Sequence, residues 1–485
     1  MYVSSFICHP ATVADWCDVG RVTIDILPDI ALLEIFECYV NQAREEEDEE
    51  EEGWLKIQAW HTLVHVCRQW RTVVLGSPRR LDLRLFCTDK TPVKEMLAVW
   101  PPLPIVIGQY GPPTQTDNIV VAFGHSDRVC QVGLLNMTNS ELEEVLAAMQ
   151  QPFPALTYLI IWLSDWEDEL LEDQMVAPDS FLGGSAPRLQ CLHLQHFPFP
   201  GLPKLLLSAT GLVSLHIWKL PHSGYISPKA MVCCLFTLTR LEEFTIGFKS
   251  PLSRPVRGTR RSHPPTRSAL PSLTYFRFEG VSEYFEDLVI QIDAPLLDSL
   301  YIRFFHELIF DTPQLAQFVA RTPNIQPPVE TRIAFYDHYV EVTSPRSFPR
   351  NFVLGIRCRQ SDWQLSSLTQ LCSSSFPEAF ISTVEHLYIV DLHPCWQDDI
   401  EDSQWLEVLH PFTAVKYLFL SKEFASHIAP ALQEFAGEVL PSLQNIFLKD
   451  FRPSVPVQGA IGKFVAARQL ASNPIAVSHY DGVLH

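Results

Sequence analysis

The sequence lacks the cysteine pattern of an extracellular or zinc-binding protein. Its twelve cysteines include no C-x-x-C pair, and the one adjacent pair, Cys233 and Cys234, could not form a relaxed disulfide within a regular element. Scattered cysteines of this kind are typical of buried free thiols in a reducing compartment. The sequence therefore predicts neither a disulfide framework nor a zinc site.

Signals for secretion and membrane insertion are also missing. No uninterrupted apolar run approaches the roughly 18 residues that a membrane-spanning helix needs. The N-terminal stretch has no basic region, and its apolar residues are interrupted by His9, Pro10, Asp15 and Asp18, which is unlike a secretory signal. We therefore expect an intracellular protein of the cytoplasm or nucleus.

Basic residues are scarce relative to acidic ones. The 36 Lys and Arg residues stand against 56 Asp and Glu residues, which gives a formal net charge of -20. Nucleic acids and anionic membranes bind basic surfaces, so neither is an expected partner. Hydrophobic residues make up 47% of the chain and charged residues 19%, which is the composition of a globular protein.

Catalytic motifs are absent as well. There is no G-x-S-x-G nucleophile motif, and GAIGK at 459–463 lacks both the spacing of a phosphate-binding loop and its following Ser or Thr. His61 and His65 have the i, i+4 spacing of a zinc-binding helix, but Thr62 stands where H-E-x-x-H has its general base. The sequence predicts no enzymatic activity, no metal site and no cofactor.

Two amphipathic helices are predicted near the N-terminus. The first follows Leu27 and Pro28, and proline suits the first position of a helix because it lacks an N–H. Its apolar face carries, at helical spacing, Leu32, Ile35, Phe36, Tyr39 and Val40. The second helix, within residues 54–74, carries on one face Leu63, Val66, Cys67, Trp70, Val73 and Val74.

These helices resemble the F-box, a module that starts with Leu-Pro and ends with a Val-Cys-x-x-Trp-like helix. The matching residues are Leu27, Pro28, Leu32, Leu33, Ile35, Phe36, Leu63, Val66, Cys67 and Trp70. The region is similar, over about 80 residues, to the F-box/leucine-rich-repeat families expanded in some fungi. The resemblance implies that these residues bind the Skp-type adaptor of a cullin-RING ubiquitin ligase. The alternative is a helical hairpin that only caps the domain after it.

An acidic run, residues 45–52, departs from the F-box pattern because it interrupts the connection between the helices. Like charges at helical spacing repel by roughly 0.2–0.5 kcal/mol per pair, so we expect a solvated loop. It is either a tolerated insertion or a loop that weakens adaptor docking.

We divide the chain into an N-terminal extension (1–24), the F-box-like module (25–78) and a repeat domain (79–485).

A six-residue pattern, L-x-x-L-x-L with Val, Ile or Phe as alternatives, recurs in the repeat domain. Its nine rows open at Leu156, Leu189, Leu212, Leu241, Leu273, Leu297, Val384, Val415 and Leu443. Helical segments between the rows indicate irregular leucine-rich repeats of one strand plus one helix each. In the widest gap, segments 332–342 and 351–359 are each expected to add a strand that keeps the period. The predicted fold class is α/β, a helical module followed by a solenoid.

Residues between the row leucines are predicted to form a binding surface. Side chains alternate across a strand, so these residues face the concave side that the architecture implies. Trp, Tyr and Arg dominate protein-binding hot spots, and the anchors we expect are Trp162, Trp218, Tyr301, Tyr388 and Phe419. Alternatively, aromatic residues simply suit strands, or loops or the C-terminal tail cover them.

One segment, 249–268, interrupts the repeats with six basic residues, four prolines and no acids. Proline removes backbone donors and like charges repel, so we expect a disordered surface loop.

Taken together, the sequence predicts a subunit that recruits a protein target to an SCF-type ubiquitin ligase, while other subunits transfer ubiquitin. The alternative is an F-box/leucine-rich-repeat scaffold that degrades nothing.

Overall fold

The computed structural model describes most of the chain. The described residues are 27–45, 59–109, 116–163, 176–253, 267–306, 312–344, 352–358, 363–372, 378–391, 402–434, 438–449, 460–471 and 473–480. They belong to two compact units, Met1–Cys87 with Lys94–Val106, and Thr88–Val93 with Ile107–His485. The extension 1–24, residues 46–52 of the acidic run and residues 254–266 of the basic segment lie outside the described residues.

The first unit is mainly helical. Its elements are α1 (Asp29–Glu45), α2 (Ala59–Val64), α3 (Arg68–Gly76) and β1 (Leu85–Cys87), and α4 (Val93–Val99) and β2 (Ile105–Gln109) cross its boundary. In α1, Leu32, Phe36 and Val40 are buried, and the Phe36 ring packs against Trp70 with 4.7 Å between centroids. The predicted first helix is present, but its predicted apolar face is only partly buried, because Ile35 and Tyr39 are exposed. Helix α1 also includes Glu45, which we expected in the loop.

The second predicted helix is instead two helices, α2 and α3. Between them Cys67 has an extended backbone (φ -156°, ψ 174°), and its Sγ accepts a hydrogen bond from the N–H of Trp70 at 3.5 Å. Cys67 therefore caps the start of α3 and does not continue α2. Because the helical spacing does not hold across this break, Val66 is exposed while Leu63 is buried.

Trp60 on α2 is a central packing residue of the first unit. Its indole is buried and donates a hydrogen bond from Nε1 to the carbonyl oxygen of Arg84 at 3.1 Å. Trp100 packs against Trp60 edge-on at 5.1 Å and stacks on His61 at 5.0 Å between centroids. Burial lowers the pKa of His61, so this histidine serves as a neutral packing group.

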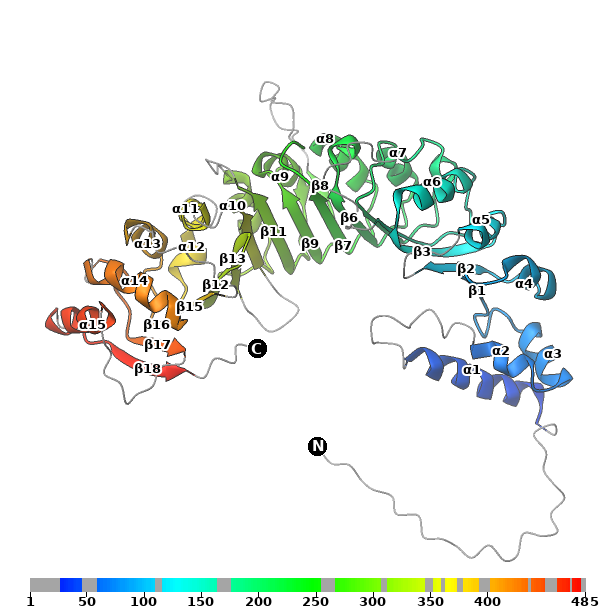
Figure 1. The fold of residues 1–485 in the computed structure, drawn as a ribbon, viewed down its shortest axis with the longest axis horizontal. Coiled ribbons are helices and arrows are strands. Elements are labelled where there is room, and N and C mark those ends of the chain that lie inside the picture. The colour runs from blue at the N-terminus through cyan, green and yellow to red at the C-terminus, as the bar shows by residue number, and fades with distance from the viewer. Residues whose placement is uncertain are drawn as a thin grey trace, which may run out of the picture. The chain divides into compact units, whose positions relative to one another are not determined.

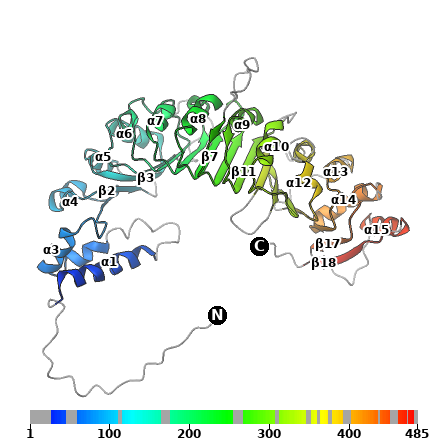
Figure 2. The same ribbon diagram turned by 180° about the vertical axis from the view of Figure 1, so that it is seen from behind.

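The second unit is an α/β repeat array. Its strands are β3 (Val129–Met137), β4 (Tyr158–Leu163), β5 (Cys191–Gln195), β6 (Ser214–Leu220), β7 (Glu243–Phe248), β8 (Ser268–Ala269), β9 (Tyr275–Gly280), β10 (Ile292–Asp293), β11 (Ser299–Phe305), β12 (Glu330–Phe335), β13 (Tyr339–Ser344), β14 (Phe352–Arg357), β15 (His386–Asp391), β16 (Tyr417–Leu420), β17 (Asn445–Lys449) and β18 (Ala476–Tyr480). Its helices are α5 (Asp117–Phe123), α6 (Asn139–Ala148), η3 (Phe181–Gly184), α7 (Leu202–Ser208), η4 (His222–Gly224), α8 (Pro228–Leu235), α9 (Ser282–Val289), α10 (Pro313–Ala320), α11 (Trp363–Gln370), α12 (Glu378–Ser382), α13 (Asp402–Leu409), α14 (Lys422–Glu434) and α15 (Ala460–Leu470). Helices α6 to α10 lie along one side of the sheet in both views (Figures 1 and 2).

The repeat leucines form the core of this unit. All nine residues that open the predicted rows are buried, and each lies two residues before a strand. Parallel pairing from β4 to β11 aligns the next core residues in one row, Leu159, Leu192, Leu215, Phe244, Phe276 and Leu300. Burying one such side chain contributes about 1.5–3 kcal/mol before entropy is subtracted. The predicted strand-plus-helix repeat is confirmed.

The sheet departs from sequence order between β11 and β15, where the order is β11-β14-β13-β12-β15. Strand β14 pairs in parallel with β11, and β13 runs antiparallel to both β14 and β12. The prediction of one strand over 332–342 was therefore wrong, because β12 and β13 form a hairpin with its turn at Asp337. Alternation of apolar and polar residues continues on both sides of that turn, and alternation carries no information on strand direction.

Polar side chains join successive repeats. The Glu286 carboxylate of α9 accepts hydrogen bonds from the backbone N–H groups of Gln314 and Leu315, both at 2.8 Å. These two donors lie in the first turn of α10, where N–H groups have no partner within the helix. The carboxylate also lies at the positive end of the helix dipole, so Glu286 stabilises the start of the next helix.

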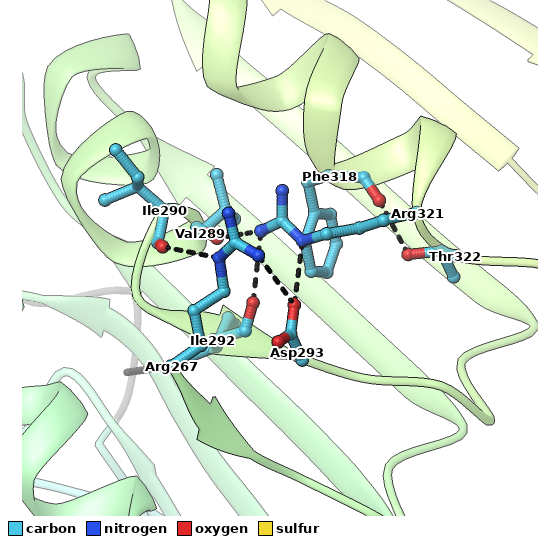
Figure 3. Close-up of polar contacts among 8 residues, drawn as sticks. All are labelled: Arg267, Val289, Ile290, Ile292, Asp293, Phe318, Arg321 and Thr322. Atoms are coloured by element: carbon cyan, nitrogen blue, oxygen red, sulfur yellow. Dashed lines mark hydrogen bonds and ion pairs between the residues drawn. The ribbon is translucent and has the colours of Figure 1, made fainter. Parts of the chain in front are cut away.

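Arginine residues satisfy the other end of α9 (Figure 3). Arg321 donates to Asp293 Oδ1 at 2.9 Å and to the carbonyl oxygens of Val289 and Ile292. Arg267 donates to the carbonyl oxygen of Ile290 at 3.2 Å. Arg267 and the strand β8 after it end the basic segment that we expected to be disordered, so this end of the segment is structured.

Every cysteine in the described ranges is a free thiol, and Cys87, Cys234, Cys358 and Cys372 are buried. No helix among the described residues is both long and apolar enough to cross a membrane.

Candidate functional site

The open face of the sheet is the side opposite helices α6 to α10 (Figure 1). The residues that alternate with the core lie on it. In β4 the indole of Trp162 is 38% exposed, whereas Ile161 and Leu163 on either side are buried. Strand β5 shows the same alternation. Residues between the repeat leucines therefore face away from the core, as predicted.

A hollow of about 180 Å³ lies on the open face over β4 to β9. It is lined by Trp162, His193, Leu194, Gln195, His216, Trp218, Thr245, Tyr275 and Arg277. Strand register places His193, His216, Thr245 and Arg277 in one row, and Trp162, Gln195 and Trp218 in the next. Two of the predicted anchors thus belong to the same hollow.

Trp218 of β6 reaches Arg277 of β9 across the intervening strand β7. It can do so because Gly247 of β7 has no side chain: a Cβ there would lie 2.6 Å from Cε3 of the indole. The guanidinium carbon of Arg277 lies 4.2 Å from the Trp218 ring centroid. Stacking of this kind on an aromatic face favours a guanidinium, so Trp218 holds Arg277 in one orientation.

A hydrogen-bonded chain borders the hollow. Ser214 Oγ donates to Glu243 Oε2 at 3.0 Å, and His193 Nε2 lies 3.0 Å from the same Oγ. His216 Nε2 lies 3.3 Å from Glu243 Oε2. A hydroxyl has one proton, which here goes to the carboxylate, so His193 Nε2 must be the donor to Ser214. The arrangement orders the open face and does not give His193 the role of a base toward Ser214.

Both histidines of the hollow are neutral at neutral pH. Burial, together with the His216 ring 4.0 Å away, lowers the pKa of His193 to about 4. Burial also lowers the pKa of His216, although its hydrogen bond to Glu243 opposes that shift. The imidazoles therefore offer hydrogen bonds and ring surface without positive charge.

The lowered pKa of His193 predicts a pH-dependent stability. The folded-state pKa lies below the unfolded value of 6.5, so the unfolded chain binds more protons between these values. The His193 contribution is present above pH 6.5 and is lost as the pH falls toward 4. Denaturant titrations at pH 7, 5.5 and 4.5 should show a shallower loss of stability for His193→Gln than for the unmodified chain. If the free energy of unfolding fell equally steeply with pH in both proteins, the lowered pKa of His193 would be contradicted.

A second cluster of open-face residues consists of ion pairs around Glu279, which is 5% exposed. Arg303 lies 3.7 Å from Glu279 and 3.6 Å from Glu341, and Arg357 lies 3.2 Å from Glu279. Gly355 separates Arg303 from Glu341 in the register, and its missing side chain leaves room for that pair. The cations of this cluster are thus already matched by carboxylates.

The third group is an aromatic ladder on β15, β16 and β17. Tyr388 stacks on Phe419 at 4.2 Å, and Phe419 stacks on Phe447 at 4.6 Å between centroids. Tyr388 is 9% exposed, so this predicted anchor is largely used in packing. Tyr301, another predicted anchor, packs against Tyr275 at 5.3 Å.

Within the first unit, the residues that match the F-box pattern differ in how much of each side chain is exposed. Leu32, Phe36 and Leu63 are buried, and Leu27, Leu33, Cys67 and Trp70 are partly exposed. Pro28 is exposed, as are Ile35 and Val66, at 46% and 55%. The predicted adaptor-binding set therefore contains both core residues and surface residues.

The importance of Arg277 and Gly247 escaped the sequence analysis. Residues between the row leucines were expected on one face as a class, but the role of these two depends on which residues lie beside them on neighbouring strands. A glycine between a tryptophan and an arginine on consecutive repeat strands is the signal that could have indicated the stacked pair.

Among the described residues, no group of three or more His, Cys, Asp or Glu side chains could hold a metal ion. Comparison with known proteins adds little to this geometry. No protein-family model matches the chain, and no characterised protein matches it in sequence. Among solved structures, the chain is similar to the leucine-rich repeat-containing protein LegL7 from Legionella pneumophila, at 12% identity over 75% of this chain and 97% of that chain, with a TM-score of 0.26. The repeat architecture is therefore established by the strand and helix geometry itself.

Proposed function

We propose that this chain recruits a protein target to an SCF-type ubiquitin ligase. Helices α1 to α3 bind the Skp-type adaptor, and the open face of the repeat sheet binds the target. The observation that carries the adaptor role is the exposed apolar set on these helices. Ile35 and Tyr39 are 46% and 43% exposed and lie one turn apart on α1, so they are surface neighbours, and Val66 is also exposed.

The first unit satisfies its own core without these side chains. Leu32, Phe36 and Val40 face inward, together with Val64 and Val74. Exposed apolar groups that add nothing to the core reduce solubility unless a partner covers them. A helical docking surface for an adaptor gives them a use, and it agrees with the Leu-Pro and Val-Cys-x-x-Trp pattern that resembles the F-box.

The proposed role requires no catalytic group in this chain. Holding a target near a charged conjugating enzyme raises the effective concentration of the target lysine, and that proximity is the contribution of a recruiting subunit. The open face suits the target role because its Trp, Tyr and Arg side chains are the types that dominate protein interfaces.

Charged substitutions at the exposed apolar positions should abolish adaptor binding. The double variant Ile35→Asp, Val66→Asp should capture a co-expressed Skp-type adaptor at least about 30-fold less well, since losing a hot spot costs about 2 kcal/mol or more. Thermal unfolding should stay unchanged because both side chains are exposed. The matched control is Leu207→Asp on α7, which is 50% exposed and should bind the adaptor normally.

Undiminished adaptor capture by the double variant would overturn the adaptor role. If the adaptor binds, co-purification of neddylated cullin separates a ligase subunit from a scaffold that degrades nothing.

A further inference from the structure

Arg277 is the cation that lines the hollow. Within the described part of the chain, it forms no ion pair with a carboxylate, whereas Arg303 and Arg357 on the same face share Glu279. The nearby Glu243 is held by Ser214 and His216. Arg277 is instead oriented by Trp218, 4.2 Å below its guanidinium carbon. One of its donors is used in a hydrogen bond to the Tyr275 side chain, and a guanidinium has five N–H donors, so the others are left for a partner.

The hollow has one positive charge and no negative one among the described residues that line it. His193 and His216 are neutral because burial lowers the pKa of each, and Tyr275 is neutral because burial raises its pKa. Its other lining residues are apolar or uncharged. The Glu243 carboxylate borders the hollow, but it is hydrogen-bonded to Ser214 and His216. Arg277 is therefore the lining group that attracts an anion.

The size of the hollow selects the kind of ligand. Its volume is about 180 Å³, below the roughly 300–1,000 Å³ of pockets that enclose small molecules. It suits one or two side chains of a peptide. The backbones of Trp162 and Trp218 lie two strands apart on either side of Gln195, about 10 Å at the usual strand spacing, and both indoles line the hollow as apolar surfaces.

The charge of the hollow selects the anion. Phosphorylated side chains carry nearly two negative charges and are recognised by clusters of arginines. A single planar guanidinium matches a carboxylate, with two parallel N–H···O bonds. We infer that the hollow binds an acidic peptide segment of the target, in which one carboxylate pairs with Arg277 and an adjacent apolar side chain lies between Trp162 and Trp218.

This inference rests on the proposed function, because it concerns the surface that holds the target. The test uses the full chain and three pools of fluorescent, terminally blocked nonapeptides. Each pool has Leu, Phe or Tyr at the positions flanking the centre and Gly elsewhere, and the centre is Glu, Gln or phosphoserine. Binding is followed by fluorescence polarisation up to millimolar peptide.

The Glu pool should bind at least about tenfold more tightly than the Gln pool, which corresponds to about 1.4 kcal/mol. Arg277→Gln should remove that difference. Arg357→Gln, which removes the same charge from the same face, should retain it because Arg357 is already engaged by Glu279. Gly247→Ala should also weaken binding of the Glu pool about tenfold without changing any charge, because its Cβ would displace Trp218.

Several outcomes would overturn the inference. These are equal binding of the Glu and Gln pools, a preference that survives Arg277→Gln, tighter binding of the phosphoserine pool than of the Glu pool, or no binding of any pool. Adaptor capture by Arg277→Gln is measured in parallel and should be normal. Failure of the unmodified chain to capture the adaptor would instead count against the proposed function, whatever the peptide pools show.

Discussion

Replacing Leu192 with alanine should lower the free energy of unfolding by about 2–5 kcal/mol. Leu192 is fully buried and lies in the core row between Leu159 of β4 and Leu215 of β6. Truncation leaves a cavity that rigid neighbouring strands cannot fill. Trp162→Ala should have a much smaller effect, because its indole is 38% exposed on the opposite face of the sheet.

Denaturant unfolding and target capture, measured on the same two variants, separate a core role from a binding role. Leu192→Ala should unfold at lower denaturant and still bind targets while folded. Trp162→Ala should fold normally and lose binding to targets that proximity labelling identifies in the native cell. If Trp162→Ala were as destabilised as Leu192→Ala, the indole would be covered in solution and the binding role of the open face would be wrong.

Removing both arginines around Glu279 should cost about 3–5 kcal/mol of folding free energy. The double variant Arg303→Met, Arg357→Met leaves a carboxylate whose side chain is 6% exposed without the two cations that now lie 3.7 and 3.2 Å away. The single variant Arg357→Met should cost less than about 1 kcal/mol, since its side chain is 51% exposed and Arg303 still pairs with Glu279.

A third substitution tests the cause of that loss. Adding Glu279→Met to the double variant removes the more buried of the two carboxylates that lost a cation, while Glu341 keeps its hydrogen bond from Tyr336. Apolar replacement of a whole buried ion pair is often neutral or stabilising. The triple variant should therefore recover most of the lost stability in denaturant unfolding. A triple variant as unstable as the double variant would show that the arginines stabilise the sheet by packing and not by neutralising Glu279.

The repeat core could be predicted from sequence because its signal is local. Leu156 or Leu241 opens a row in which buried residues recur within six positions, and strand alternation then fixes the face of each neighbour. The break at Cys67 could not be predicted in this way, since apolar residues at helical spacing continue across it. The hairpin of β12 and β13 escaped prediction for a related reason, because its strands read alike in either direction.

The open-face residues were predicted individually, but their grouping was not. Trp218 and Arg277 are 59 positions apart in the chain, and they meet because of strand register and because Gly247 leaves space between them. The low exposure of Tyr388 likewise depends on Phe419 stacking over it from the next repeat. Alternation indicates the face on which a side chain lies, whereas partners from other strands decide how much of it is free.

The order β11-β14-β13-β12 also affects how the chain folds as it is synthesised. Tyr301 of β11 pairs with Val353 of β14, so about 50 residues must follow β11 before its partner strand exists. At a synthesis rate of about 5–20 residues per second, this interval is roughly 3–10 s. During that time β12 emerges first, whereas from β3 to β11 each strand of the main sheet pairs with the next strand of that sheet to be made. The nascent chain therefore passes through a stage at which β11 could pair with the wrong strand, and the native topology requires that pairing to be avoided or undone.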